Sequence, residues 1–390
     1  MLCIIALASV FALFLILAVF QLQCRLRVYS KYSEIATLLD PPHSPIPLLL
    51  SARAQPNERL ARIFGLSNSF VSAESRVRKQ FITRARELLR EHTQHFAAFP
   101  DATRRTVAEV ATHLLSVSNP HPNAIPFATF VQVVTMRVVV RSFLGGDIPQ
   151  DTDEDVIFVV RAINELWASS KKRLTRTPAI LERLNSHVSQ WLPTYESPLD
   201  FIIPSYETMW RVVAVTVAQA GHDRGAQAAF LSYLDSPNEC QYKDFSNGGP
   251  SVEHFLWEVL RLHPPSRRLA RATSPQFPGF STWGCARDEV ADLEALHRDT
   301  QIWGQQGHIF DPMRFHPTRL SHEQHRAFIP FGYGPLRCIA YKEAPRFAAI
   351  VAASILEIVN EPRAKYRLVC GEKLGRRDGW DGWSIEAVDD

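Results

Sequence analysis

The sequence has little net charge and lacks the short signatures of several large enzyme classes. Lysine and arginine number 43 against 40 aspartate and glutamate, which gives a net charge of +3. This near balance argues against a nucleic-acid-binding surface spread over the protein. The sequence contains no glycine-rich phosphate-binding P-loop and no Ser-His-Asp signature of a hydrolase. Charge and these motifs therefore indicate no particular partner.

Cysteine is also scarce, and no two cysteines form a C-x-x-C pair. This excludes the usual zinc-site spacings and a dense disulfide framework. It fits a reduced domain that faces the cytosol. Several histidines show no metal-site spacing either, and we interpret them as structural: His254, His263, His297 and His308. The six cysteines are Cys3, Cys24, Cys240, Cys285, Cys338 and Cys370.

The first residues differ from the rest of the chain, because residues 2–22 contain no charged side chain and are mostly aliphatic. About 20 helical residues cross the hydrocarbon layer of a membrane. Arg25, Arg27 and Lys31 follow at once and should hold that end in the cytosol. A cleaved secretory signal is the alternative, but no basic region precedes the apolar run and no small-x-small site follows it. We expect a transmembrane anchor over 1–24 and a single-pass protein with a cytosolic body.

A basic segment with four prolines follows, over residues 25–60. Pro41, Pro42, Pro45 and Pro47 favour an extended, stiff conformation over a helix. We therefore expect a hinge here and a catalytic domain over 61–390. With 46% apolar residues in 390, the chain can bury one large core or two modest ones.

Apolar residues recur with helical spacing through most of the chain up to about Leu262. The helix predicted over 74–89 is strongly basic on its polar faces. After Pro264 and Pro265 the sequence up to about Arg326 is rich in proline and glycine, which predicts short strands and loops. The fold class is therefore mainly α with a small β part. The other predicted helices cover 103–115, 127–143, 155–168, 178–192, 199–220, 252–263 and 341–359.

One loop carries the most chemical information, because Gly332 and Gly334 precede Cys338, which stands before a predicted apolar helix. Glycines at such positions can take positive φ and let the backbone approach a flat cofactor closely. Free N–H groups at a helix start stabilise a thiolate. A thiolate is an iron ligand that favours O–O cleavage when it holds haem. A buried structural cysteine under a turn is the alternative interpretation of this loop taken alone.

This loop resembles that of the cytochromes P-450, whose ligand loop has the form F-x-x-G-x-x-x-C-x-[GA]. Phe331, Gly334, Cys338 and Ala340 match it. The resemblance implies that Cys338 is the metal ligand of haem (iron protoporphyrin IX) and that Phe331 packs beside the sulfur. One departure is Leu336, where many members carry an arginine that contacts a haem propionate. We therefore add the neighbouring Arg337 to the candidate cofactor-binding residues.

A second match is Glu258-Val259-Leu260-Arg261, followed by the double proline. Spacing i, i+3 puts Glu258 and Arg261 on one helix face. Alone, such a pair is more often a solvated surface pair. It resembles the E-x-x-R motif of the same family, and Asp311-Pro312-Met313-Arg314-Phe315 resembles the P-x-R-F segment. The resemblance implies a buried structural triad of Glu258, Arg261 and Arg314.

Two further arginines stand where the family binds haem propionates. Arg271, after the double proline, matches such a position, and Arg78 falls where the arginine of a W-x-x-x-R motif would stand. Glu74 replaces the tryptophan of that motif. Ordinary surface arginine remains the alternative for both residues.

Family members that activate dioxygen carry the form [AG]-G-x-[DE]-T in a helix over the haem. The candidate here is Pro204-Ser205-Tyr206-Glu207-Thr208, which keeps the acid and the alcohol but changes the small pair. Pro204 lacks an N–H and can open the helix locally. The resemblance implies a catalytic proton path through Glu207 and Thr208. A solvated Glu-Thr pair on a kinked helix is the alternative.

The resemblance implies a cytochrome P-450-like fold with a shortened N-terminal region behind the anchor, and a membrane monooxygenase of the endoplasmic reticulum. Its expected partners are an apolar small-molecule substrate, O2 and an NADPH-dependent membrane reductase, with no nucleic acid. The divergent motifs look most like fungal members of secondary metabolism. Two alternatives stay open: an O2-independent isomerase or dehydratase of the same fold, and a degenerate membrane protein without haem.

Overall fold

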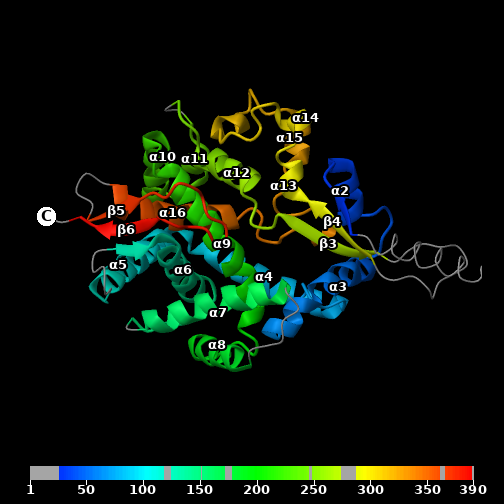
Figure 1. Ribbon diagram of the computed structural model, residues 1–390, viewed down its shortest axis with the longest axis horizontal. Helices are drawn as coiled ribbons and strands as arrows, with labels where there is room; N and C mark the ends of the chain where they lie inside the picture. Colours follow the sequence, from blue (N-terminus) through cyan, green and yellow to red (C-terminus); the bar gives the residue numbers. More distant parts are fainter. Residues whose placement is uncertain are drawn as a thin grey trace, which may run out of the picture.

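A computed structural model describes residues 26–117, 124–150, 152–171, 178–245, 248–273, 287–360 and 365–388. The described chain is mainly helical, with two small sheets at opposite ends (Figure 1). The fold class predicted from the sequence, mainly α with a small β part, is confirmed. Its helices include α2 (Tyr32–Leu39), α3 (Ile46–Phe64), α4 (Ser75–Gln94), α5 (Phe99–Val117), α6 (Phe127–Val138), α7 (Asp153–Lys171), α8 (Pro178–Trp191), α9 (Leu199–Ala220), α10 (Arg224–Asp235), α11 (Glu239–Lys243), α12 (Val252–Leu262) and α16 (Ala344–Asn360).

The first sheet joins segments from the two ends of the sequence. Strand β1 (Arg27–Tyr29) pairs in parallel with β4 (Arg287–Asp292), which pairs antiparallel with β3 (Arg268–Thr273). The second sheet has the order β2 (Ala124–Pro126), β6 (Ser384–Ala387) and β5 (Tyr366–Val369), all antiparallel. Short helices fill the segment between β4 and α16: α13 (Leu293–Leu296), α14 (Thr300–Trp303) and α15 (His322–Ala327).

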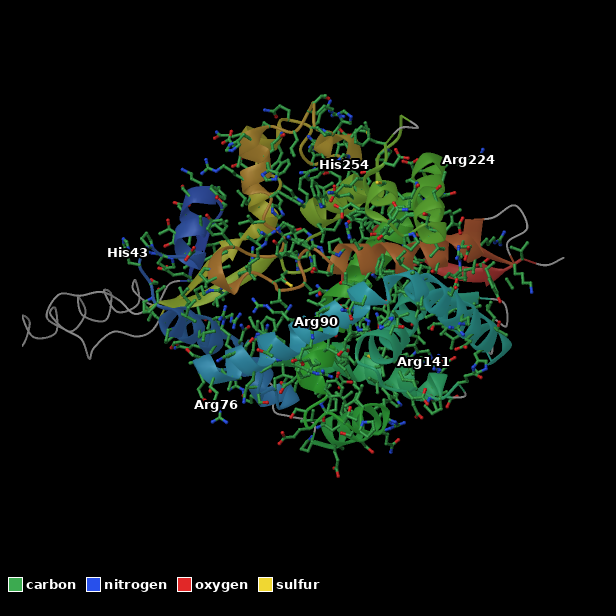
Figure 2. The ribbon with its side chains drawn as sticks, turned by 180° about the vertical axis from the view of Figure 1, so that it is seen from behind. His43, Arg76, Arg90, Arg141, Arg224 and His254 are labelled. Carbon is green, nitrogen blue, oxygen red and sulfur yellow. The ribbon has the colours of Figure 1, made fainter. Side chains whose placement is uncertain are left out.

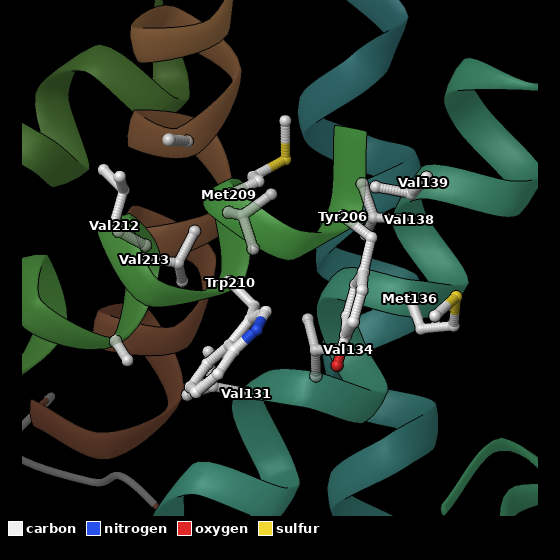
Figure 3. Close-up of a cluster of buried hydrophobic side chains, with 14 of the residues drawn as sticks. Val131, Val134, Met136, Val138, Val139, Tyr206, Met209, Trp210, Val212 and Val213 are labelled. Atoms are coloured by element: carbon white, nitrogen blue, oxygen red, sulfur yellow. The ribbon is translucent and has the colours of Figure 1, made fainter. Parts of the chain in front are cut away.

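Helix α9 crosses the middle of the protein and is buried on most sides (Figure 1). Its residues Tyr206 and Trp210 are fully buried. Figure 3 shows both side chains pointing toward Val131 and Val134 of α6. Aromatic side chains of this size bury large apolar areas and dominate core energetics. This packing fixes the rotation of α9 about its own axis and therefore determines which of its residues face away from α6.

The extended conformation predicted for the segment of Pro41 to Pro47 is wrong from Ile46 onward, where α3 begins. Pro47 lies in the first turn of α3, where a missing N–H leaves no hydrogen bond unmade, and Pro56 lies inside the same helix. Strand β1 ties this segment to β4 of the folded body. Pro45 and Pro47 therefore stand at the start of a helix instead of preventing one. The division into anchor, hinge and catalytic domain stays a prediction.

The membrane anchor predicted over 1–24 lies outside the described residues. Within the described ranges, no helix is long and apolar enough to cross a membrane. Helices 199–220 and 178–192 match α9 and α8 closely, while the helix predicted over 127–143 ends in a π-helical turn, η2 (Val139–Phe143).

Candidate functional site

The loop before α16 presents Cys338 through a compact turn. The Cys338 N–H donates to the Phe331 carbonyl at 3.0 Å. Gly332 and Gly334 have φ of 79° and 69°, values that residues with a side chain rarely adopt. A Cβ on Gly334 would lie 2.6 Å from Cβ of Asp40, at the end of α2. Conformation and close approach therefore both require glycine at position 334.

The Cys338 side chain is exposed. Surrounding protein atoms nevertheless desolvate the thiol and raise its pKa above the usual value. The N–H of Ala340 and the charge of Arg337 act in the opposite direction and lower the pKa. The thiol is thus accessible to an electrophilic metal, although protein atoms lie around it.

The helix predicted to begin at residue 341 begins at Ala344 instead, so its free N–H groups do not lie directly after the cysteine. Residues 339–343 form turns, and the Ala344 N–H donates to the Ala340 carbonyl at 2.8 Å. The donor to the sulfur is therefore the N–H of Ala340 in this turn. The sequence pattern could not separate a turn from a first helical turn, because neither glycine nor proline marks the boundary in residues 339–343.

One stripe of α9 is only half-buried, although the rest of the helix is mostly core. Its members follow helical spacing, so they share one face: Phe201, Pro204, Ser205, Thr208 and Arg211. Glu207 lies on a neighbouring face and is 2% exposed. Thr208, predicted from the sequence as a proton donor, is therefore on the open face, whereas Glu207 is not.

The Glu207 carboxylate is held by two arginines. Arg377, from the segment before β6, donates to Oε1 at 2.5 Å and also to Oε2. Arg211 Nη2 lies 3.7 Å from Oε2 and forms a second ion pair with the carboxylate. Trp210 Nε1 is 3.5 Å from Oε1. Glu207 thus forms a buried ion pair that ties α9 to the segment before β6.

Two buried arginines stand without a carboxylate partner in the part of the chain that the structure describes. Arg53 of α3 and Arg271 of β3 are 8% and 5% exposed, and the Nε of each makes no hydrogen bond. Burial lowers the pKa of each to about 10, and for Arg53 the charges of Arg271 and Arg78 lower it further. Arg78 of α4 donates to the Pro335 carbonyl at 3.0 Å, beside the cysteine loop. Buried cations without counter-charge are costly, so this group favours an anionic ligand.

Glu258, Arg261 and Arg314 are brought together below the loop. Arg261 donates from Nε and Nη2 to the two oxygens of Glu258, each at 2.7 Å, and both side chains are fully buried. Arg314 Nε lies 3.6 Å from Glu258 Oε1, an ion pair without a hydrogen bond. Arg261 also donates to the carbonyls of His297 and Gly307, each at 2.6 Å. The triad thus ties α12 to the irregular segment before Cys338.

The remaining predicted residues lie around the same loop. Phe331 is half-buried and packs against the main core. Arg337 is exposed, and its guanidinium lies 3.7 Å from the ring centre of Tyr341. Sequence reasoning missed Arg53, because it fell in a presumed hinge, and Arg377, because no motif surrounds it. Their signal is spatial: Arg53 meets Arg271 and Arg78, while Arg377 meets Glu207.

Comparison with known proteins agrees with this geometry. The sequence model of the family described as cytochrome P-450 matches residues 234–340. Benzoate 4-monooxygenase bphA of Aspergillus niger is 26% identical over 130 residues, 32% of this chain and 24% of that protein. Cytochrome P-450 4F8 of Homo sapiens is 30% identical over 141 residues, 34% of this chain and 27% of that protein. The matched region thus spans about a quarter of the length of these curated relatives.

The fold is similar over most of the chain. The crystal structure of a cytochrome P-450DA mutant haem domain aligns with 93% of this chain and 87% of its own, with a TM-score of 0.62 and 15% identity. Residues 234–340 thus match the cytochrome P-450 family in sequence, and most of the chain has a fold similar to that of a solved cytochrome P-450. This similarity points to haem iron as the cofactor.

The residues present fit haem. An exposed thiol supplies the metal ligand, and Gly332 and Gly334 leave the adjoining backbone free of side chains. Arg53, Arg78 and Arg271 form a cationic group, and the buried Nε atoms of Arg53 and Arg271 make no hydrogen bond, so they can serve the propionate groups of a haem. Cys338 would hold the iron and these three arginines the propionates.

Proposed function

We propose that the protein is a haem-thiolate monooxygenase that oxidises an apolar small molecule with O2. One observation carries the proposal: an exposed Cys338 thiol on a glycine loop that Arg78 contacts, with Arg53 and Arg271 buried next to Arg78 and without a carboxylate partner among the described residues. Bound haem supplies the redox chemistry that activates dioxygen. The protein's own residues must hold that group, exclude water and deliver protons.

Cys338 acts as a thiolate in this proposal. The Ala340 N–H and the positive charge of Arg337 both stabilise the negative sulfur. Binding of an iron cation would remove the remaining obstacle, which is the desolvation that raises the thiol pKa. Phe331, whose carbonyl accepts from the Cys338 N–H, keeps the loop closed under the sulfur.

In this proposal, the Thr208 hydroxyl is the proton donor. Its position on the half-buried stripe of α9 leaves the side chain partly exposed, and Pro204 one turn earlier removes one N–H from the helix. The proposed path from Glu207 needs a rotation of its carboxylate, because Arg377 and Arg211 hold it now. Water can replace that step, so Thr208 is the group on which proton delivery depends.

The fixed Glu207 carboxylate gives one observation in favour of a second candidate, an O2-independent isomerase or dehydratase. Such chemistry needs the haem but no proton path to dioxygen. A carboxylate with two arginine partners suits an anchoring role better than a relay. Oxygen consumption in the presence of a reductase separates the two candidates.

We further propose that electrons come from an NADPH-dependent membrane reductase and that the predicted anchor over 1–24 places the protein at the endoplasmic reticulum with a cytosolic catalytic domain. A role in secondary metabolism is the proposed context, and it rests on the divergent sequence motifs alone. Purified full-length protein should bind haem with one cysteine thiolate and give the thiolate-type absorption band when reduced under carbon monoxide. A protein that folds but takes up no haem would instead be a non-catalytic member of the fold.

A further inference from the structure

A second cationic group lies at the end of the open stripe of α9. Arg211 belongs to this stripe and follows Thr208 by three residues, roughly 4.5 Å along the helix axis. Its Nη1 donates to the Pro265 carbonyl at 2.8 Å and its Nε to the Glu207 carbonyl at 2.9 Å. The guanidinium is therefore fixed next to Glu207 and near the position proposed for proton delivery.

Two more arginines share one aromatic ring at this place. The guanidinium carbon of Arg377 lies 4.7 Å from the ring centre of Trp167, and that of Arg59 lies 5.3 Å from it. Arg59 Nη1 also donates to Ser170 Oγ at 2.5 Å. Cation–π contacts hold guanidinium groups in place without neutralising them. Arg59 and Arg377 are thus both held at the ring of Trp167.

Cations outnumber carboxylates here. Lys171, at the end of α7, joins Arg59, Arg211 and Arg377, while Glu207 is the carboxylate that this group contacts. Burial and the charge of Arg377 lower the pKa of Arg59, and burial with the neighbouring arginines lowers that of Lys171. The Arg211 pKa falls to about 10 despite the opposing effect of Glu207. Among the described residues, Arg211 and Arg377 contact one carboxylate and no carboxylate partner is found for Arg59 and Lys171, so this group carries an excess of positive charge.

We propose that Arg59, Lys171, Arg211 and Arg377 bind the carboxylate group of the substrate. This assigns the substrate class as an apolar small molecule with one carboxylate, and it rests on the proposed monooxygenase function. Arg211 and Arg377 have side chains only 17% and 13% exposed, which suits a small ligand better than a protein or membrane surface. The planar forks of arginine match a carboxylate through paired hydrogen bonds, as Arg377 already shows with Glu207.

Equilibrium dialysis of the full-length, haem-loaded protein tests this assignment. The probes are dodecanoate and 4-phenylbutanoate, each against its neutral amide and, for the longer chain, against dodecyl phosphate. We expect each acid to bind roughly tenfold or more tightly than its amide, because the amide has no charge for the arginines. Equal binding of acid and amide, or tighter binding of the phosphate, would overturn the assignment.

The informative variants are Arg59→Gln and Lys171→Gln. Neither residue has a carboxylate partner within the described ranges, so both variants should fold, and the loss of repulsion should not destabilise them. Each should reduce the preference for acid over amide several-fold and leave amide binding unchanged. Arg224→Gln, which removes the same charge from the exposed start of α10 (Figure 2), should keep the full preference.

The absorption spectrum of the same samples keeps the two proposals separate. If the wild-type protein shows haem-thiolate bands but no preference for acids, the substrate assignment is wrong and the proposed function stands. If it binds acids through these residues but holds no haem, the monooxygenase function fails, and so does the substrate role that rests on it.

Discussion

Arg377 and Glu207 lie 170 positions apart in the sequence and are joined by two hydrogen bonds between nearly buried side chains. This pair attaches the segment before β6 to the central helix α9. It gives Glu207 an anchoring role that the Glu-Thr motif alone did not suggest. It also places the segment that carries Arg377 beside the stripe on which Thr208 lies.

Replacing either partner should therefore destabilise the protein. Glu207→Gln and Arg377→Gln should each lower the free energy of unfolding by about 3 kcal/mol, because each leaves a buried charge without its partner. The double variant should lose less than the sum, with a coupling of about 1–3 kcal/mol in a double-mutant cycle. Urea unfolding of the two single variants and the double variant, compared with the wild type, measures this coupling. Additive losses would show that the two side chains do not interact in solution.

Thr208→Val should uncouple oxygen use from product formation. The substitution keeps the shape but removes the hydroxyl from the open stripe, so NADPH and O2 are still consumed while hydrogen peroxide replaces oxidised product. General acid catalysis of this kind contributes about 10²–10⁴-fold. The measurement is product formed per NADPH oxidised, with peroxide quantified alongside.

Ser205→Ala is the matched control for Thr208. Ser205 lies on the same stripe, but its hydroxyl already donates to the Phe201 carbonyl at 2.6 Å. Its loss should leave the product ratio unchanged. If Thr208→Val also leaves that ratio unchanged, another group delivers the protons or the reaction does not use dioxygen.

Glu258→Ala should prevent accumulation of folded, haem-loaded protein. The change strands the guanidinium groups of Arg261 and Arg314, and breaking a buried ion pair costs about 3–5 kcal/mol. This free energy is a large part of the stability of a typical domain. The haem content of the purified protein and the midpoint of its unfolding measure the loss.

Glu239→Ala provides the comparison for Glu258, because it removes a carboxylate that pairs with Lys243 and Arg346 at the exposed helix α11. Solvated pairs contribute little, so this variant should retain normal haem content. Normal haem content in Glu258→Ala as well would mean that the triad does not support the cysteine loop.

Deletion of residues 2–23 should release much of the protein from membranes. This prediction depends on the sequence alone, since a run of about 20 apolar residues is long enough to span. The soluble and pellet fractions of expressing cells, compared for the full and shortened chains, provide the measurement. An unchanged pellet fraction would point to an apolar surface elsewhere that binds the membrane.

The sequence predicted the helical body well, because periodicity and proline positions mark long buried helices such as α9 and α12. Spaced motifs also led to Cys338 and to Glu258 with Arg261, since their chemistry is carried by short local patterns. The extended conformation predicted from the prolines was wrong at residues 45–47, because Pro45 caps α3 and Pro47 lies in its first turn. A proline can start a helix or prevent one, and composition does not separate the two.

Contacts between distant segments escaped the sequence altogether. Arg53 meets Arg271 across α3 and β3, and Arg377 meets Glu207 across 170 positions. Neither Arg53 nor Arg377 stands in a motif, and isolated arginines are usually solvated. Only the fold shows that these charges are buried and share neighbours.

The central claim is that Cys338 binds haem iron through its thiolate, and the reduced, carbon monoxide-bound absorption spectrum tests it most directly. Wild-type protein and Cys370→Ser, which changes another exposed cysteine, should both show the thiolate-type band. Cys338→His should still bind haem but show the band of imidazole ligation instead. A Cys338→His variant that keeps the thiolate-type band would contradict the account, because another cysteine would then be the ligand.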